Sequence, residues 1–171
     1  LVEIYSSYPR CVSDSLMNIL STHDTERILT VLGDMYRPDA PNDHLAVMRM
    51  TAQEKETAIK RLKLASILQY TVYGIPSVFY GDEAGMEGYH DPFCRMPFPW
   101  GREDAELLEH YRTLGRLRRE HPSLSCGDFR FLACTEHAFA FERFDSESGD
   151  RLTVAANMGD TPFQFHPTGS R

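Results

Sequence analysis

A helix with a well-defined start and end lies between two short apolar runs, and this arrangement constrains the fold most. Thr51 and Glu54 fit the capping box T-x-x-E, in which two side chains satisfy free N–H groups at a helix start. Gly74, followed two residues later by a proline, ends the helix, because proline cannot continue it. The flanking runs, residues 15–20 and 75–83, are predicted to be strands. Strand, helix and strand in this order indicate two parallel strands.

The remainder of the chain is predicted to form one more helix and then a series of short strands. Apolar residues recur at helical spacing between residues 103 and 121, and Pro122 lies beyond the end of this helix. Four alternating or apolar runs follow, separated by turn residues, and predict a small antiparallel β unit: residues 128–134, 137–144, 151–157 and 162–167. Because two βα units cannot close a barrel of about 250 residues, we expect an α/β fold built from the last two βα units of a (β/α)8 TIM barrel and a separate small β domain.

The predicted domain boundary lies where the spacing of apolar residues changes from helical to alternating. Residues 1–124 would form the barrel part and residues 125–171 the β domain. The chain starts at Leu1 rather than Met, within what looks like a structured segment, so we expect a piece of a longer protein.

Charge and composition argue against several classes of function. The formal net charge of −7 and the pI near 5.5 give no basic surface, so no nucleic-acid partner is expected. No apolar run approaches the roughly 18 residues of a membrane span, and the amino terminus lacks a signal-peptide pattern. We therefore expect no membrane partner and a cytoplasmic protein.

The cysteine pattern also favours the cytoplasm. They show no C-x-x-C spacing and are predicted to be reduced thiols, although a Cys126–Cys134 bridge across a hairpin stays open as an alternative. His90 and Cys94 could suggest a metal pair, but without a second pair at ligand spacing we favour ordinary surface or pocket residues. No metal or cofactor is expected in this segment.

A histidine and an aspartate stand side by side where the first predicted strand ends, in "NILSTHDTERI". Barrel enzymes carry catalytic residues at the carboxyl ends of their strands, which would give His23 and Asp24 a catalytic place. The alternative is structural: Asp24 caps the turn and His23 packs in the loop. These residues alone leave the two interpretations about equal.

Two segments in order carry a resemblance to a known family. "LMNILSTHDTERI" resembles the region of the seventh strand of the α-amylase family of retaining α-glucan glycosidases, whose hallmark there is an adjacent His-Asp. "GIPSVFYGDEAGMEGYHDPFCRMPFPW" is similar to the eighth strand and its following loop, especially in neopullulanase, cyclomaltodextrinase and pullulanase-like members. The resemblance runs through essentially the whole chain and favours the catalytic interpretation. It also implies that the β domain, residues 125–171, is an incomplete all-β sandwich.

The resemblance implies roles for individual residues. Asp24 would be the third carboxylate, which grips ring hydroxyls and stabilises the oxocarbenium-like transition state of a retaining glycosidase. His23 would donate a hydrogen bond to the same sugar. Asp91 and Arg95 are the candidates for a sugar-binding wall, because arginine offers a fork of donors. Tyr80 is a candidate for stacking on a glucose ring.

Other residues receive a structural interpretation. Asp82 and Glu83 are adjacent and point in different directions, so we expect them to anchor loops at the barrel rim rather than to act as an acid–base pair. Glu26 and Arg27 are expected to pair with each other in the loop. The further aromatic residues are expected to be core more often than sugar-binding: Phe93, Phe98 and Trp100.

Retaining chemistry also needs a nucleophile and an acid/base about 5 Å apart, which in the family come from earlier strands. Neither is recognised in this chain, so the resemblance implies an inactive piece of an enzyme that hydrolyses or transfers α-1,4 or α-1,6 linkages of α-glucans or maltooligosaccharides. Any calcium site would belong to the missing part. We expect the isolated chain to form a homo-oligomer or to swap elements, since strand edges would be exposed. The alternative is a non-catalytic amylase-like scaffold.

Overall fold

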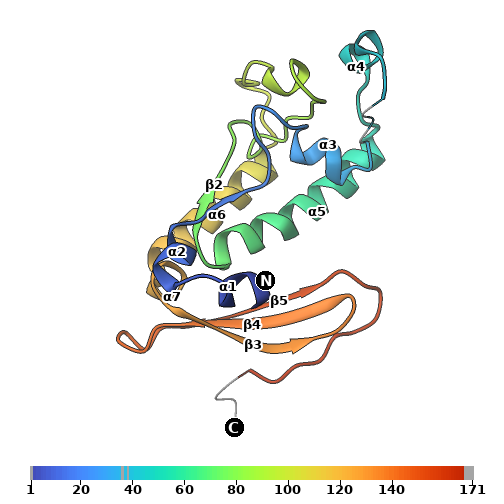
Figure 1. Cartoon of the computed structure of the whole chain (residues 1–171). Helices are drawn as coiled ribbons and strands as arrows, with labels where there is room; N and C mark the ends of the chain where they lie inside the picture. Colours follow the sequence, from blue (N-terminus) through green and yellow to red (C-terminus); the bar gives the residue numbers. More distant parts are fainter. Residues whose placement is uncertain (1, 36, 38, 168–171) are drawn as a thin grey trace. The chain divides into compact units, whose positions relative to one another are not determined.

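The computed structural model describes residues 2–35, 37 and 39–167 of the chain (Figure 1). It divides into two compact units. The sheet unit comprises Leu1–Met17, Tyr70–Ile75 and Gly115–Arg171, and the helix unit comprises Asn18–Gln69 and Pro76–Leu114. The predicted division at residue 124 stays a prediction.

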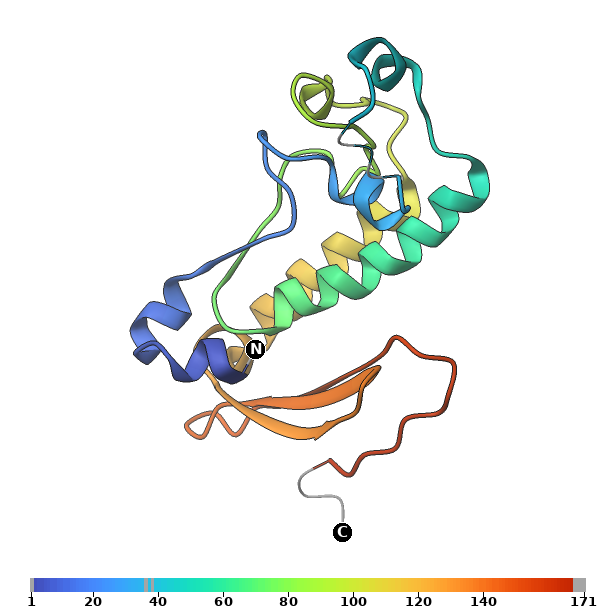
Figure 2. The same ribbon diagram turned by 45° about the vertical axis from the view of Figure 1, so that its right-hand side comes forward.

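Two long helices form the framework of the helix unit. Helices α5 (Ala52–Thr71) and α6 (Ala105–Glu120) lie side by side (Figure 2). Between them Ser66 Oγ and His110 Nε2 are 2.9 Å apart. Their buried apolar side chains include Ala58, Leu62, Leu107 and Leu114. Both helices were predicted from their apolar spacing, and both predictions are confirmed.

The capping box of α5 forms as the sequence predicts. The backbone N–H of Thr51 donates to Glu54 Oε2 at 2.7 Å, and the N–H of Glu54 donates to Thr51 Oγ1 at 3.3 Å. At the other end of the helix Gly74 has a φ of 96°, in the left-handed region that favours glycine. Local sequence signals therefore fix both ends of this helix.

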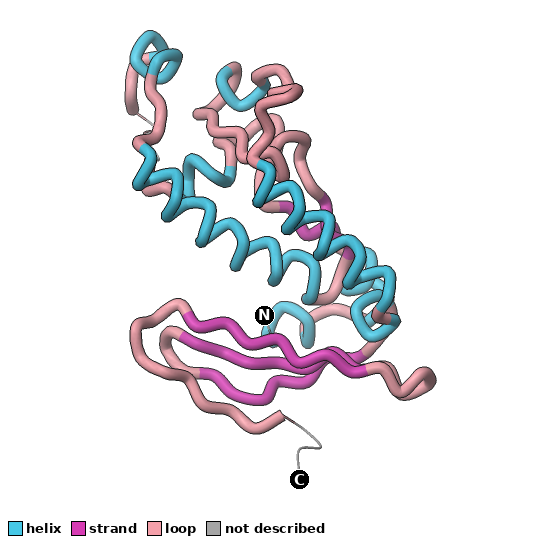
Figure 3. Tube along the Cα trace, turned by 180° about the vertical axis from the view of Figure 1, so that it is seen from behind, coloured by secondary structure: helices cyan, strands magenta, loops and turns pink. Residues whose placement is uncertain are grey.

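The two predicted strands exist but are short. Strands β1 (Met17–Ile19) and β2 (Ile75–Ser77) pair in a two-stranded sheet. Gln69 Nε2 in α5 donates to the carbonyls of Asn18 at 2.8 Å and Ser77 at 2.9 Å, and so joins the ends of both strands to the helix. After β1 and β2 the chain continues in irregular loops (Figure 3), and these loops carry the candidate site.

The sheet unit contains three antiparallel strands. The order is β3 (Asp128–Cys134), β4 (Ala138–Phe144) and β5 (Arg151–Asn157), with β4 in the centre. Phe141 of β4 is fully buried and stacks on Phe129 with ring centroids 4.6 Å apart. These strands confirm the predicted small β unit. Its assignment as a sandwich stays a prediction.

The fourth predicted strand, residues 162–167, is wrong: this stretch has no regular structure. Both of its end residues, Pro162 and Pro167, lack the N–H that a strand ladder requires. The preceding turn is held by Asn157 Nδ2, which donates to the carbonyl of Thr161 at 2.9 Å. Alternating apolar residues alone are therefore not enough to add a strand here.

Several short helices accompany the two long ones. They include α1 (Val2–Ser6), α2 (Arg10–Ser15), α3 (Ile28–Leu32), α4 (Asn42–Val47), the 3₁₀ helix η1 (Phe93–Arg95) and α7 (Pro122–Ser125). Pro9 is the N-cap of α2, and Pro41 is likewise the N-cap of α4. Proline is tolerated at a helix start, where its missing N–H costs nothing.

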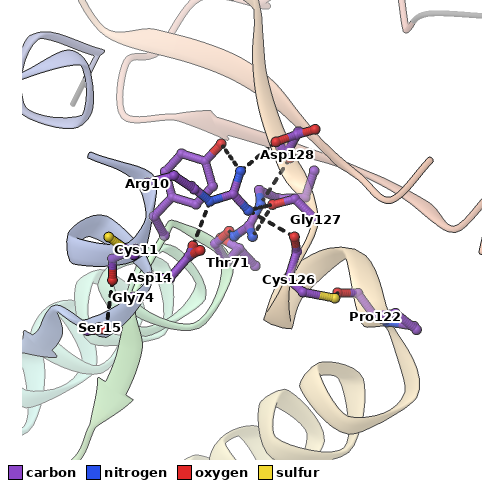
Figure 4. A network of polar contacts seen from close by, with 12 residues as sticks. Arg10, Cys11, Asp14, Ser15, Thr71, Gly74, Pro122, Cys126, Gly127 and Asp128 are labelled. Atoms are coloured by element: carbon purple, nitrogen blue, oxygen red, sulfur yellow. Dashed lines mark hydrogen bonds and ion pairs between the residues drawn. The ribbon is translucent and has the colours of Figure 1, made fainter. Parts of the chain in front are cut away.

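Two arginine side chains hold the sheet unit together, and Figure 4 shows the contacts of one of them, Arg10. Arg10 of α2 donates to Asp14 at 2.7 Å, to the Tyr73 hydroxyl at 3.2 Å and to the Gly127 carbonyl at 2.6 Å. Arg143 of β4 is almost completely buried and donates to the carbonyls of Thr71 at 2.8 Å and Gly127 at 3.0 Å. Burial lowers the pKa of Arg143 to about 10.

A carboxylate at the start of β5 ties down helix α7. Asp150 accepts hydrogen bonds from His121 Nδ1 at 2.8 Å and from the backbone N–H of Ser123 at 3.0 Å. Burial alone would raise the pKa of Asp150, but the hydrogen bonds from Ser123 and His121 outweigh it and lower this pKa to about 2. The charged carboxylate therefore stabilises the folded state.

The lowered pKa of Asp150 predicts the pH range in which this stabilisation disappears. It is fully present above the ordinary carboxyl pKa near 4 and is lost as the pH falls towards 2. Because the side chain is partly exposed, we expect Asp150→Asn to lower the free energy of unfolding by only about 1 kcal/mol at pH 7. Urea unfolding at pH 7, 4 and 3 should show this difference shrinking with acid. A constant difference, or one equal to that of the exposed-site control Asp160→Asn, would contradict the assignment.

Candidate active site

The loops that follow β1 and β2 meet around one arginine. Arg95 Nη2 donates to Asp24 Oδ1 at 3.2 Å, and Arg95 Nε lies 2.8 Å from Asp91 Oδ1. The same Nε donates to the carbonyl of His23 at 3.0 Å, and His23 Nε2 lies 3.2 Å from Asp24 Oδ2. We call His23, Asp24, Asp91 and Arg95 the Asp24–Arg95 cluster.

The cluster unites four of the five site residues predicted from the sequence. All four side chains are largely solvent-exposed, with exposed fractions from 46% for Arg95 to 69% for Asp24. A ligand can therefore reach the carboxylates and the guanidinium. Charged donors and acceptors form stronger hydrogen bonds than neutral ones, and this set offers both kinds to a polyhydroxylated molecule.

Tyr80, the fifth predicted residue, contributes to an aromatic surface. Its hydroxyl donates to the carbonyl of Met96 at 2.9 Å, and its side chain is 41% exposed. A cavity of about 590 Å³ is lined by Tyr80, Glu83, Phe98, Trp100, Glu103, Leu108 and Arg112. Trp100 is 81% exposed, so the expectation that this residue belongs to the core is wrong. Phe98, only partly buried, lies 4.6 Å from it between ring centroids.

A buried arginine, which the sequence analysis misassigned, lies among these loops. Arg27 was expected to pair with Glu26 in the loop, but its side chain is completely buried and pairs with Asp82 Oδ1 at 3.3 Å. Its Nε donates to the carbonyl of Cys94 at 2.8 Å, and its Nη1 donates to the carbonyl of Tyr80. The one available signal was its place directly before the apolar run ILTVL.

Asp82 anchors the loop through contacts within the protein, as predicted. Its carboxylate accepts from Ser21 Oγ at 2.5 Å and from Arg27, and it is almost fully buried. Burial raises the pKa of Asp82, while the bonds from Ser21 and Arg27 act in the opposite direction. A raised carboxyl pKa is common in catalytic acids, but here both oxygens are engaged inside the protein. Glu83 Oε2 accepts from the backbone N–H of Gly81 at 2.8 Å, which is also an anchoring contact.

His90 and Cys94, the possible metal pair of the sequence, each contact a backbone carbonyl. Cys94 is buried and its thiol donates to the carbonyl of His23 at 3.2 Å, while His90 Nδ1 lies 3.0 Å from the Asp91 carbonyl. Within the described part of the chain, no group of three His, Cys, Asp or Glu residues could hold a metal ion. The four cysteines are free thiols, so the alternative Cys126–Cys134 bridge is not formed.

A second cavity of about 600 Å³ lies among residues 45–55 and 84–102. Its lining includes Met48, Met86, Phe93 and Met96, and it contains none of the five predicted site residues.

The helices of the described residues include none that is long and apolar enough to cross a membrane.

Known proteins are similar to this chain over most of its length, including the candidate site. The chain is 43% identical over 143 residues to an amylopullulanase of Thermoanaerobacter thermohydrosulfuricus, covering 84% of this chain and 9% of the relative. It is 32% identical over 154 residues to a cyclomaltodextrinase of a Bacillus species, covering 89% of this chain and 24% of the relative. No family model matches the sequence.

A solved structure supports the same relationship. The chain matches a cyclic α-maltosyl-(1→6)-maltose hydrolase from Arthrobacter globiformis, in complex with cyclic α-maltosyl-(1→6)-maltose, with a TM-score of 0.71 and 25% identity. The match covers 92% of this chain and 30% of the hydrolase. The chain thus spans less than a third of the length of each of these proteins.

These similarities first define a class: the relatives are glycoside hydrolases, and the structural neighbours combine a TIM barrel with a carboxyl-terminal domain. Within that class, the chain belongs to the α-amylase family, as a segment homologous to amylopullulanases, cyclomaltodextrinases and neopullulanases. The resemblance inferred from the two sequence segments is confirmed.

Proposed function

We propose that this chain is the carboxyl-terminal part of a retaining α-glucan glycosidase, which hydrolyses or transfers α-1,4 or α-1,6 glucosidic linkages, and that Asp24 is its transition-state stabiliser. One observation carries the proposal: Asp24 is exposed at the end of the loop after β1, with His23 on one carboxylate oxygen and Arg95 on the other. This gives a carboxylate a fixed orientation without burying it. The homologous hydrolases supply the substrate class.

The roles of the other residues follow from their chemistry. In a retaining mechanism positive charge develops on the sugar ring, and hydrogen bonds to ring hydroxyls strengthen in the transition state. Asp24 accepts such bonds, and His23 donates to a hydroxyl of the same sugar. Asp91 and Arg95 bind a neighbouring part of the glucan, with the guanidinium as a rigid fork of donors. Tyr80 stacks on a glucose ring at the cavity that Trp100 also lines.

The nucleophile and the acid/base come from other parts of the polypeptide in this proposal. Asp24 and Asp91 both bind the guanidinium of Arg95, which suits them to gripping hydroxyls rather than to forming a covalent intermediate. We therefore expect no hydrolysis by the isolated chain. Calcium, if the whole enzyme uses it, would bind outside this segment.

A comparison of two polypeptides tests the proposed function. The 171-residue chain should release no reducing ends from pullulan or maltodextrin, whereas the protein encoded by its complete natural reading frame should hydrolyse at least one of them. That reading frame should carry an Asp and a Glu at the ends of two consecutive strands. A complete protein without these carboxylates, or without activity on α-glucans, would contradict the proposal.

The proposal also assigns each part of the chain to a domain of the enzyme. Residues 1–124 supply the last two βα units of the barrel, and residues 125–171 supply part of a β-sandwich. In support, β1, α5, β2 and α6 follow one another in the expected order, and the three strands β3, β4 and β5 come after them. We assign the protein to the cytoplasm, since Cys11, Cys126 and Cys134 are exposed free thiols.

The isolated chain is expected to self-associate or to swap elements. The strongly exposed apolar side chains of the described residues include Met17 at 61%, Ile19 at 46%, Ile75 at 53% and Trp100 at 81%. Surfaces of this kind pair with other chains. Light scattering at micromolar concentration should give at least the mass of a dimer, and a clean monomer would count against the expectation.

A non-catalytic amylase-like scaffold is the alternative function. A scaffold has no need of exposed charged groups held at a strand end, and the Asp24–Arg95 cluster consists of such groups. The cluster therefore favours the enzyme.

A further inference from the structure

Arg27 connects three segments that are distant in the sequence. Its side chain reaches the carbonyls of Tyr80 and Cys94, and its backbone N–H donates to the carbonyl of Gly88 at 2.9 Å. The guanidinium also lies over the ring of Phe79, with its central carbon 4.2 Å from the ring centroid. The loop after β1 is therefore fastened through one residue to the end of β2 and to the loop beyond it.

One of these contacts leads directly to the candidate site. Cys94 is the residue before Arg95, and both belong to η1. Arg27 Nε holds the Cys94 carbonyl at 2.8 Å, while the Cys94 thiol donates to the carbonyl of His23 at 3.2 Å. The Arg27–Cys94 contact is buried and the Cys94–His23 contact is partly buried, whereas Arg95 is exposed and contacts Asp24.

The close packing around Arg27 makes this attachment rigid. A Cβ atom added at Gly88 would lie 3.3 Å from Arg27 Cγ and 2.5 Å from the Phe93 carbonyl oxygen. The loop backbone thus approaches both Arg27 and the start of η1 as closely as glycine allows. A side chain with no exposed surface and fixed partners on several sides has little freedom to move.

We propose that Arg27 is a positioning residue, which sets the place of Arg95 relative to Asp24 by holding the Cys94 carbonyl from the protein interior. The inference rests on the proposed function, because it assigns Arg27 to the same glucan-binding cluster. Arg27 itself has no exposed surface and does not touch the ligand. Its ion pair with Asp82 neutralises the buried charge, and its Nε contact with Cys94 orients the cluster.

Two variants separate positioning from simple stabilisation. Arg27→Lys keeps the positive charge beside Asp82 but has a single nitrogen, which cannot hold the Cys94 and Tyr80 carbonyls as the arginine fork does. Arg27→Met combined with Asp82→Leu removes both buried charges, a change that buried ion pairs often tolerate. The matched control is Ser21→Ala, which removes the 2.5 Å hydrogen bond to Asp82 and leaves the Arg27–Cys94 contact intact.

Two readouts on the full 171-residue chain test the proposal. The first is the NMR signal of the Arg95 Nε–H, which donates to the His23 carbonyl and lies 2.8 Å from Asp91. The second is the dissociation constant for maltotriose. In both Arg27 variants we expect the Nε–H signal to move to the position of a free arginine and maltotriose to bind about tenfold more weakly. In Ser21→Ala both should stay near the wild-type values.

The outcomes distinguish this inference from the proposed function. If the Arg95 signal stays unchanged in both Arg27 variants, the positioning role is wrong, whatever happens to sugar binding. If wild type fails to bind maltotriose, or Asp24→Asn binds it as tightly as wild type, the glucan-binding function is wrong, and the Arg95 signal still decides the role of Arg27. Equal effects of Ser21→Ala and the Arg27 variants would reduce Arg27 to a structural residue.

Discussion

Replacing Arg27 with methionine is expected to lower the free energy of unfolding by about 3–5 kcal/mol, because it leaves the carboxylate of Asp82 buried without its cation. Asp82 is 2% exposed and its remaining partner would be Ser21. The pKa of Asp82 is already raised by burial, so loss of the arginine should raise it further. Urea unfolding at pH 7, followed by circular dichroism, measures the change.

The double variant Arg27→Met with Asp82→Leu provides the control for that prediction. It removes both charges together, so no unpaired ion remains, and we expect it to recover most of the lost stability. A double variant as unstable as Arg27→Met alone would show that the lost hydrogen bonds to Tyr80 and Cys94, rather than the unpaired charge, dominate the cost.

Asp24→Asn is expected to reduce kcat/KM on maltodextrin about 10²–10³-fold in the complete protein, because it removes the negative charge that stabilises the transition state. The substitution keeps the size of the side chain and leaves an oxygen that can still accept from Arg95. Folding should therefore be unchanged. The initial rate of reducing-end release, measured at substrate concentrations below KM, gives the comparison.

Asp34→Asn is the matched control for Asp24→Asn. Asp34 is an exposed carboxylate paired with Arg61 at 2.7 Å, and its φ of 59° is one that asparagine also adopts readily. Activity should stay within about twofold of wild type, since surface ion pairs contribute little. An equal loss of activity in the two variants would show that Asp24 has no special role.

Local signals in the sequence predicted the elements that depend on local chemistry. The bounds of α5 follow from Thr51, Glu54 and Gly74, whose effects act within one helical turn. The three strands of the sheet unit were predicted from alternation and turns. Residues 162–167 show the limit of this reasoning, since they alternate in the same way and yet form no strand.

The members of the candidate site could be predicted because their place depends on strand ends and on a short motif. His23 and Asp24 lie in the loop after β1, and Asp91 and Arg95 lie four residues apart in the segment after β2. Their grouping around one guanidinium was not predicted. It depends on contacts between residues about 70 positions apart, which no local pattern encodes.

The burial of Arg27 is the clearest failure of the sequence analysis. A charged residue between Glu26 and an apolar run is usually exposed, and a neighbouring acid is its obvious partner. Its actual partner, Asp82, is 55 residues away in the chain. Only the tertiary fold brings these two charges together, so the interior support of the site became visible only in the structure.

The most direct test of the central claim is a titration of the 171-residue chain with maltotriose, followed by NMR at each residue. We predict saturable shifts in the signals of His23, Asp24, Asp91 and Arg95, which disappear in Asp24→Asn and persist in Asp34→Asn. Shifts that cluster elsewhere, or a chain that maltotriose does not perturb at any concentration up to its solubility, would contradict the assignment of a glucan site to this cluster.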